Sequence, residues 1–278
     1  MKLFEINAGT FSVDGGAAFG VVPKRVWQKR YPADDENFCK VTMRCVLLEV
    51  DNRLILFETG TGDKQLDYLK YYNFEHVINF DDALANLGYT CQQVTDVVFS
   101  HLHFDHSGGA TRYNAAGELE LVFPNARHWV GEAQWKNFKQ PNVREGDSYF
   151  SENLQPIADA GKLCLVTETT KLCSKVELRL FDGHTVGQVA SYIDTPKGTY
   201  IYVGDVIPLA ANIPLAWVSS YDVYPLRAME DKERMLAEAA EKDQKLIFVH
   251  DFYTPCATIK ETNGKYRMNE ALPFYVNE

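Results

Sequence analysis

The stretch His101-Leu102-His103-Phe104-Asp105-His106-Ser107-Gly108-Gly109 places three histidines and an aspartate within six consecutive positions. It follows a β-branched run at 94–100 that is typical of a buried strand. His101 and His103 are two residues apart, so at a strand end they project to the same side and can bind one metal ion through imidazole nitrogens. Asp105 and His106 follow in the turn and can face a second ion. Two ions avoid the strain of crowding four ligands from one short loop around a single ion.

Further ligands for such a site have to come from other strand ends, and three candidates stand there. His184 lies in the Gly-flanked turn after the run at 176–181, and His250 ends the apolar run at 246–249. Asp205 ends the run at 199–203 in the same way, where its carboxylate could bridge two ions. The sequence therefore predicts a two-ion site assembled from several strand ends.

Each assignment has a plainer interpretation that stays open at this point. The segment 101–106 could be a polar turn, His184 could hydrogen-bond the backbone, and Asp205 could form an Asx turn. Asp251 could serve in place of His250, although an imidazole suits the site and strand periodicity places His250 first. Two histidines are expected outside the site: His76 at the surface and His128 in strand packing.

Outward from this loop, β-rich runs alternate with helix patterns. Two runs around the turn signal Asp51-Asn52 predict a hairpin at 41–50 and 54–57, and Gly15-Gly16 is expected to open a loop. An acidic first turn and a stop at Gly88 predict a helix at 81–87. Further strands are expected at 94–100, 119–123, 128–130, 163–168, 176–181, 189–194, 199–203 and 246–249, and further helices at 131–138 and 226–242. Two halves that each close with a helix and then a strand predict an α/β fold, a single αββα domain over residues 1–278.

Two polar segments are expected to lack regular structure. The segment 23–32 is bounded by prolines, and a surface loop is favoured there over a lid-like excursion. The segment 139–150 carries Pro141 and Gly146, which predicts a loop or a poorly specified helix start.

The composition is that of an ordinary folded protein with an acidic surface. Of 278 residues, 46% are hydrophobic and 24% charged, and the net charge is −10, which disfavours nucleic-acid partners. The densest basic cluster is expected to be a solvated face: Lys24, Arg25, Lys29 and Arg30. No run of 18 apolar residues occurs, so no membrane span is expected. The six cysteines form no C-x-x-C pair, which favours reduced thiols and a cytoplasmic location.

The motifs as a set resemble those of the metallo-β-lactamase superfamily of binuclear metallohydrolases: His-x-His-x-Asp-His, a Gly-His-Thr segment, a Gly-Asp segment and a late histidine. The resemblance implies a four-layer αββα sandwich with the site at one edge. It further implies His101, His103 and His184 on one ion, and Asp105, His106 and His250 on the other. Asp205 would lie between the two ions.

Within the superfamily the chain is most similar to the quorum-quenching lactonase and methyl parathion hydrolase branch, through the segments 19–24 and 204–208. The usual Asp-Thr-Gly is here Glu58-Thr59-Gly60, a change next to the ligands that deletes none of them. Acyl-homoserine lactonases carry a tyrosine three residues after the bridging aspartate, and this chain has Pro208 there. That departure argues against homoserine-lactone specificity.

The resemblance implies a hydrolase that uses a metal-bridging hydroxide to open an ester or lactone bond of a small molecule. Two divalent ions hold the hydroxide; zinc is the first expectation, and Mn, Fe or Co also suit His and Asp ligands. Asp105 is the candidate catalytic proton acceptor. The alternatives are a phosphodi- or phosphotriesterase on the same ions, and a non-catalytic metal or metabolite binder.

Three aromatic residues near the expected mouth of the site are candidates for a substrate pocket: Phe104, Trp217 and Tyr221. Aromatic residues are more often core, and both interpretations stay open. The sequence does not decide between a monomer and a homodimer formed through the loop at 15–32.

Overall fold

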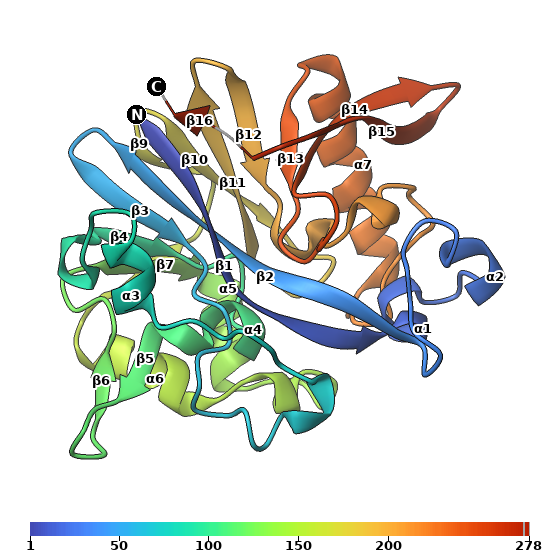
Figure 1. Cartoon of the computed structure of the whole chain (residues 1–278). Coiled ribbons are helices and arrows are strands. Elements are labelled where there is room, and N and C mark those ends of the chain that lie inside the picture. Colours follow the sequence, from blue (N-terminus) through green and yellow to red (C-terminus); the bar gives the residue numbers. More distant parts are fainter. Residues whose placement is uncertain (275, 278) are drawn as a thin grey trace.

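Two seven-stranded sheets lie face to face in the computed structural model, which describes residues 1–274 and 276–277 (Figure 1). The strands are β1 (Lys2–Asp14), β2 (Phe38–Val50), β3 (Arg53–Phe57), β4 (Asp96–Val98), β5 (Thr111–Tyr113), β6 (Leu119–Leu121), β7 (Arg127–Gly131), β8 (Leu163–Val166), β9 (Thr170–Cys173), β10 (Val176–Phe181), β11 (Gln188–Thr195), β12 (Gly198–Tyr202), β13 (Lys245–Ile247), β14 (Cys256–Thr262), β15 (Lys265–Leu272) and β16 (Val276–Asn277). One sheet has the order β16-β1-β2-β3-β4-β7-β8 and the other β15-β14-β13-β12-β11-β10-β9. β5 and β6 form a separate two-stranded ribbon.

Helices cover the outer face of each sheet (Figure 1). The helices are α1 (Gly15–Phe19), α2 (Lys24–Trp27), α3 (Phe80–Ala85), α4 (Phe104–Ser107), α5 (Glu132–Lys139), α6 (Ser151–Asp159) and α7 (Pro225–Glu241). α3, α5 and α6 pack on the first sheet through buried side chains such as Leu84, Phe138 and Leu154. α7 packs on the second sheet through Met235 and Leu236. The four layers are therefore αββα, as the sequence predicted.

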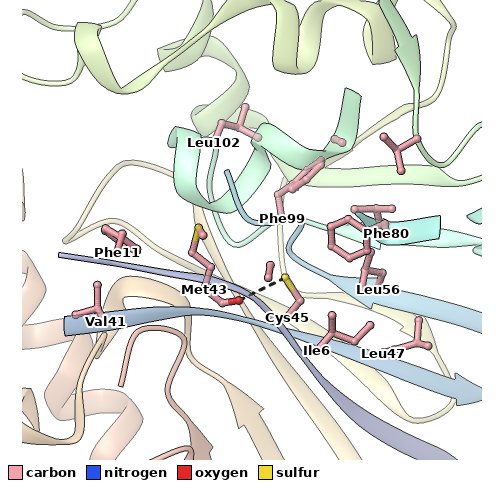
Figure 2. Packing of buried hydrophobic residues seen from close by; sticks show 14 of the residues in the cluster. Ile6, Phe11, Val41, Met43, Cys45, Leu47, Leu56, Phe80, Phe99 and Leu102 are labelled. Atoms are coloured by element: carbon pink, nitrogen blue, oxygen red, sulfur yellow. Dashed lines mark hydrogen bonds between the residues drawn. The ribbon is translucent and has the colours of Figure 1, made fainter. Parts of the chain in front are cut away.

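The alternation of side chains along β2 explains how one strand can be buried on both faces. Val46 and Leu48 point into the space between the two sheets. Cys45 and Leu47 point to the opposite face, toward the helices (Figure 2). Because successive side chains of a strand project to opposite faces, a strand that is apolar at every position needs a layer on both sides. The sandwich provides those two layers.

Most of the expected elements are present. β2 and β3 form the predicted antiparallel hairpin, and Asp51 and Asn52 take the positive φ angles of 50° and 57° that its tight turn requires. The helix expected at 81–87 is α3, the one expected at 131–138 is α5, and the one expected at 226–242 is α7. The strand expected at 94–100 is shorter, because only 96–98 pair as β4.

Two expectations about the local structure are wrong, and one helix was not expected. Gly15-Gly16 begins α1 rather than a loop, because the Asp14 side chain accepts a hydrogen bond of 3.0 Å from the Ala17 N–H and caps the helix. The segment 23–32 is not a plain surface loop, since it contains α2 and buries Trp27 and Tyr31. A helix at 151–159, α6, was not expected from the sequence. Among the described residues, no helix is long and apolar enough to cross a membrane.

Candidate metal centre

The seven predicted ligands lie on segments that each follow a strand. His101 and His103 come after β4, and Asp105 and His106 lie in α4, which starts directly after His103. The other three lie in the second half of the chain: His184 after β10, Asp205 after β12 and His250 after β13. The two halves of the sandwich therefore meet at this edge, and each supplies part of the cluster.

A close backbone contact shapes the loop that carries the first four of these residues. A Cβ atom on Gly108 would overlap the carbonyl oxygen of Thr61, and one on Gly109 would overlap that of Thr59. The loop can turn back against 59–61 only because both residues lack a side chain. Thr59 N–H also donates to the His106 carbonyl over 2.8 Å, which fixes the end of α4.

Three imidazoles converge as one set of donors. His101 Nε2 lies 3.0 Å from His103 Nδ1, and His184 Nε2 lies 3.4 Å from the same atom. Two ligand atoms bound tetrahedrally to one zinc ion at about 2.0–2.1 Å are separated by about 3.3 Å. These three nitrogens have the spacing of ligands around one ion.

A second set of donors lies beside the first. Asp105 Oδ2 is 3.5 Å from both His106 Nε2 and His250 Nε2, and the two nitrogens are 3.1 Å apart. Asp205 faces both sets: its Oδ1 is 3.2 Å from His250 Nε2, and its Oδ2 is 3.5 Å from His184 Nε2. A carboxylate in this position can bridge two ions.

The outer ring nitrogen of every histidine in the cluster faces an oxygen atom. The partners are Ser100 Oγ for His101 at 2.9 Å, Glu145 for His103 at 3.3 Å, Glu58 for His106 at 3.1 Å, Asp222 for His184 at 2.9 Å and the Thr42 carbonyl for His250 at 2.9 Å. Carboxylates and carbonyls can only accept, so the outer nitrogens of His103, His184 and His250, which hydrogen-bond to such groups, carry the proton. The inward nitrogens are then free to bind a metal ion, an arrangement common around metal-binding histidines.

The electrostatics of the cluster favour positive charge at its centre. Burial alone would raise the pKa of Asp205, but the imidazoles of His250, His106 and His184 lower it. Burial opposes a charge on His106, yet the carboxylates of Asp105, Glu58 and Asp205 raise the pKa of His106 to about 10. A divalent cation would supply the positive charge that these carboxylates attract. The donor set therefore fits divalent ions.

His101 differs from His106 in its surroundings. It is fully buried, and burial together with the neighbouring imidazoles of His106 and His103 lowers its pKa well below the usual value. A neutral imidazole keeps a lone pair for a metal ion. Glu145 stays ionised beside His103, because hydrogen bonds from His103, Thr185 and Asn137 outweigh its burial and lower its pKa to about 2.

A cavity of about 340 Å³ opens beside this cluster. Phe104 and Tyr221, both candidates from the sequence, line it, and Trp217 does not. The Trp217 ring instead packs edge-on against Phe19, and the Arg30 guanidinium lies over it at 4.4 Å. The apolar part of the wall consists mainly of Phe11, Val13, Val41 and Leu209 together with Phe104.

No sequence pattern indicated several of the residues that contact the cluster. Glu145 lies in the segment expected to be an irregular loop, and Asp222 follows Tyr221 without any metal-ligand spacing of its own. Thr42 acts through its backbone carbonyl, which no sequence pattern reveals. Glu58 was expected to lie next to the ligands, and its carboxylate does lie beside His106. His250 points into the cluster, whereas the Asp251 carboxylate accepts from the backbone of Ala210, Tyr253 and Thr254.

Solved structures with similar folds include enzymes that open lactones. A probable metal-dependent hydrolase from Staphylococcus aureus is 27% identical, with 98% of each chain covered and a TM-score of 0.87. AidC, a dizinc quorum-quenching lactonase solved with a product, is 19% identical over 99% of this chain and 95% of its own, with a TM-score of 0.80. AiiA of B. thuringiensis, with N-decanoyl-L-homoserine bound at its active site, is 19% identical over 90% and 93%, with a TM-score of 0.70.

Similarity among curated sequences is more limited. The cytochrome P450 monooxygenase mpaDE of Penicillium roqueforti (strain FM164) is 26% identical in an alignment of 137 residues that covers 43% of this chain and only 15% of that protein. The family model described as the metallo-beta-lactamase superfamily matches residues 44–250, a range that contains all seven converging side chains. This chain therefore belongs to the metallo-beta-lactamase superfamily of hydrolases.

Proposed function

We propose that this hydrolase holds two divalent metal ions and uses them to open an ester or lactone bond of a small molecule. The observation that carries the proposal is the pairing of every histidine in the cluster: each outer nitrogen faces an oxygen, and each inner nitrogen faces the other donors. His101, His103 and His184 would hold one ion, and Asp105, His106 and His250 the other. Asp205 would bridge them.

The residues of this chain would have different roles around those ions. When bound, two such ions make hydroxide available at neutral pH and polarise a carbonyl oxygen. Asp105, whose Oδ2 lies 3.5 Å from both His106 and His250, would accept a proton released during the reaction. Glu58, Glu145 and Asp222 would orient the imidazoles.

The cavity supports a carbonyl substrate with an apolar portion. Phe11, Val41 and Leu209 form an apolar wall next to the cluster, where they would exclude water from the reacting bond. Pro208 also lines the cavity and offers no hydroxyl. Burial and the Asp105 carboxylate raise the pKa of Tyr221 to about 12, so this residue offers a protonated phenol at the same cavity.

Asp105→Ala tests the proposal. We expect the variant to lose about one of two bound ions per chain, because a carboxylate ligand is removed, and turnover to fall by at least about a hundredfold. Metal content by elemental analysis and rates on a pH-indicator lactone panel measure both effects. His76→Asn is the matched control, since His76 is exposed and lies outside the cluster.

Three results would contradict the proposal. Full metal loading with unchanged turnover in Asp105→Ala would remove Asp105 from the site. Less than one ion per wild-type chain after zinc is resupplied would leave only a non-catalytic binder. Faster turnover of chromogenic phosphodi- and phosphotriesters than of lactones would instead assign the same ions to a phosphoesterase.

A further inference from the structure

One basic side chain lies in the wall of the cavity beside the metal cluster. Arg144 is the single lysine or arginine among the residues that line it, in the part of the chain that the structure describes. The other titratable groups of the wall are the acidic and histidine side chains of the cluster, Glu145, and the phenols of Tyr72 and Tyr221. The wall therefore combines a metal-binding end, an apolar stretch and one isolated positive charge.

Among the residues that the structure describes, no carboxylate forms an ion pair with the Arg144 guanidinium. The hydrogen bond recorded for its guanidinium runs from Nη2 to the backbone carbonyl of Ser220. Glu145, the next residue, turns its carboxylate away toward His103, Thr185 and Asn137.

The backbone around Arg144 is fixed in place. Asn142 Oδ1 accepts from the Arg144 N–H over 2.9 Å and from the Glu145 N–H over 3.1 Å. The carbonyl of Asn142 accepts from the Gly146 N–H over 3.1 Å, which closes the turn. The contact with Ser220 then ties the guanidinium to the loop that carries Tyr221, another residue of the cavity wall.

The geometry of the guanidinium donors favours a carboxylate as the ligand of Arg144. Its N–H donors form a planar fork that matches the two oxygens of a carboxylate, and the carbonyl of Ser220 occupies only part of the fork. The serines that line the cavity nearby, Ser148, Ser219 and Ser220, add small polar groups. Because Arg144 is exposed, it is also open to a ligand that enters from solvent.

We propose that Arg144 binds a carboxylate of the substrate, so that the preferred esters or lactones carry an anionic group separated by an apolar segment from the bond that is opened. The apolar wall accommodates that segment. This inference rests on the proposed hydrolase function. It narrows the substrate class from esters and lactones in general to those of acids with a second carboxylate.

A matched pair of esters tests the inference on zinc-loaded protein. 4-Nitrophenyl hydrogen adipate and 4-nitrophenyl hexanoate have the same leaving group and chain length, and only the adipate carries a free carboxylate. We expect the wild type to prefer the adipate ester in kcat/KM, after subtraction of the uncatalysed rates. Arg144→Gln should lower that preference about tenfold, and Arg144→Lys should keep part of it, because the charge remains but the fork is lost.

Arg25→Gln is the matched control, because Arg25 is an exposed arginine that does not line the cavity. This control should leave the preference of the wild type unchanged. If Arg144→Gln lowered kcat/KM equally for both esters, the inference would be overturned. A residue that only holds two loops together would affect both esters to the same extent. An unchanged preference in Arg144→Gln would overturn it as well.

Binding measured by calorimetry separates this inference from the proposed function. Free adipate should bind zinc-loaded wild type about tenfold more tightly than hexanoate, and Arg144→Gln should remove the difference. If neither ester is hydrolysed, the proposed function fails, and calorimetry still decides whether Arg144 recognises a carboxylate. Equal binding of the two acids by the wild type would overturn the inference even in an active enzyme.

Discussion

At the scale of single residues, the orientation of the candidate ligands depends on side chains that lie outside the cluster. Asp222 holds the outer nitrogen of His184 over 2.9 Å and also accepts from the Ser219 N–H over 3.2 Å. It therefore ties the orientation of a proposed ligand to the loop that carries Tyr221. Glu145 orients the imidazole of His103 in the same way. Its neighbour Arg144 lines the cavity.

We expect Asp222→Asn to lower metal affinity about tenfold without unfolding the protein, because a neutral amide holds the His184 ring less firmly than a carboxylate does. Chelator competition measures the affinity, and circular dichroism checks the fold. Asp243→Asn, a change of an exposed aspartate beyond α7, is the matched control. Equal metal affinity in the two variants would show that Asp222 does not support the ligand.

At the scale of elements, α7 covers the second sheet and also anchors the segment 214–217, which leads into the cavity residues Ser219, Ser220 and Tyr221. Lys232 on its buried face donates to the carbonyls of Pro214 at 2.9 Å, Trp217 at 3.1 Å and Leu215 at 3.3 Å. The loop 214–217 has little regular structure of its own, and one lysine satisfies three of its backbone acceptors. This explains why a lysine is buried on the face of α7 that packs against the sheet.

Lys232 also predicts a pH dependence of stability. Burial lowers its pKa to about 7, only partly offset by Asp222, whereas an unfolded lysine keeps a pKa near 10.5. Between these values the unfolded chain binds the additional proton, so the free energy of unfolding rises with pH from about 7 toward 10. Below pH 7 both states are protonated and this dependence disappears.

Urea denaturation at a series of pH values checks this for the wild type and for Lys232→Met. The difference in unfolding free energy between the two proteins should shift in favour of the wild type as the pH rises above 7. Lys242→Met, a change of the exposed lysine that ends α7, is the control and should run parallel to the wild type. A wild-type profile parallel to that of Lys232→Met would contradict the assignment.

At the scale of the whole molecule, the proposed ions would connect the two halves of the sandwich. Asp105 and His106 come from the first half of the chain, and His184, Asp205 and His250 come from the second. Each ion would therefore bind ligands from both halves. Ions with this placement stabilise the folded chain, since the unfolded chain does not hold the donors together.

Metal removal tests this connection. We expect chelation to lower the midpoint of thermal unfolding, because ions at about a hundred times their dissociation constant contribute about 2.7 kcal/mol of stability. Differential scanning calorimetry before chelation, after chelation and after zinc is resupplied gives the change and its reversal. A midpoint that stays the same through all three states would show that the ions do not connect the two halves.

Local sequence patterns were sufficient to predict some of the helices and strands. The turn signal Asp51-Asn52 marked the hairpin of β2 and β3, and β-branched runs marked most strands near the site. They were insufficient at Gly15-Gly16, where the Asp14 cap turns an apparent loop into α1, and at 151–159, where packing of Leu154 and Ile157 supports a helix that contains Pro156. Tertiary contacts decide such segments, because their intrinsic preferences are weak.

The sequence by itself determined the layered architecture and the candidate ligands with their spacing at strand ends, because both follow from short-range patterns of histidine, aspartate and apolar residues. Only the tertiary structure decided which groups surround those ligands. Glu145, Asp222 and the carbonyl of Thr42 reach the cluster from distant segments, and Arg144 reaches the cavity while Trp217 packs elsewhere. Such contacts depend on how the two sheets and their loops pack together. They join segments that are far apart in the sequence, so no local pattern predicts them.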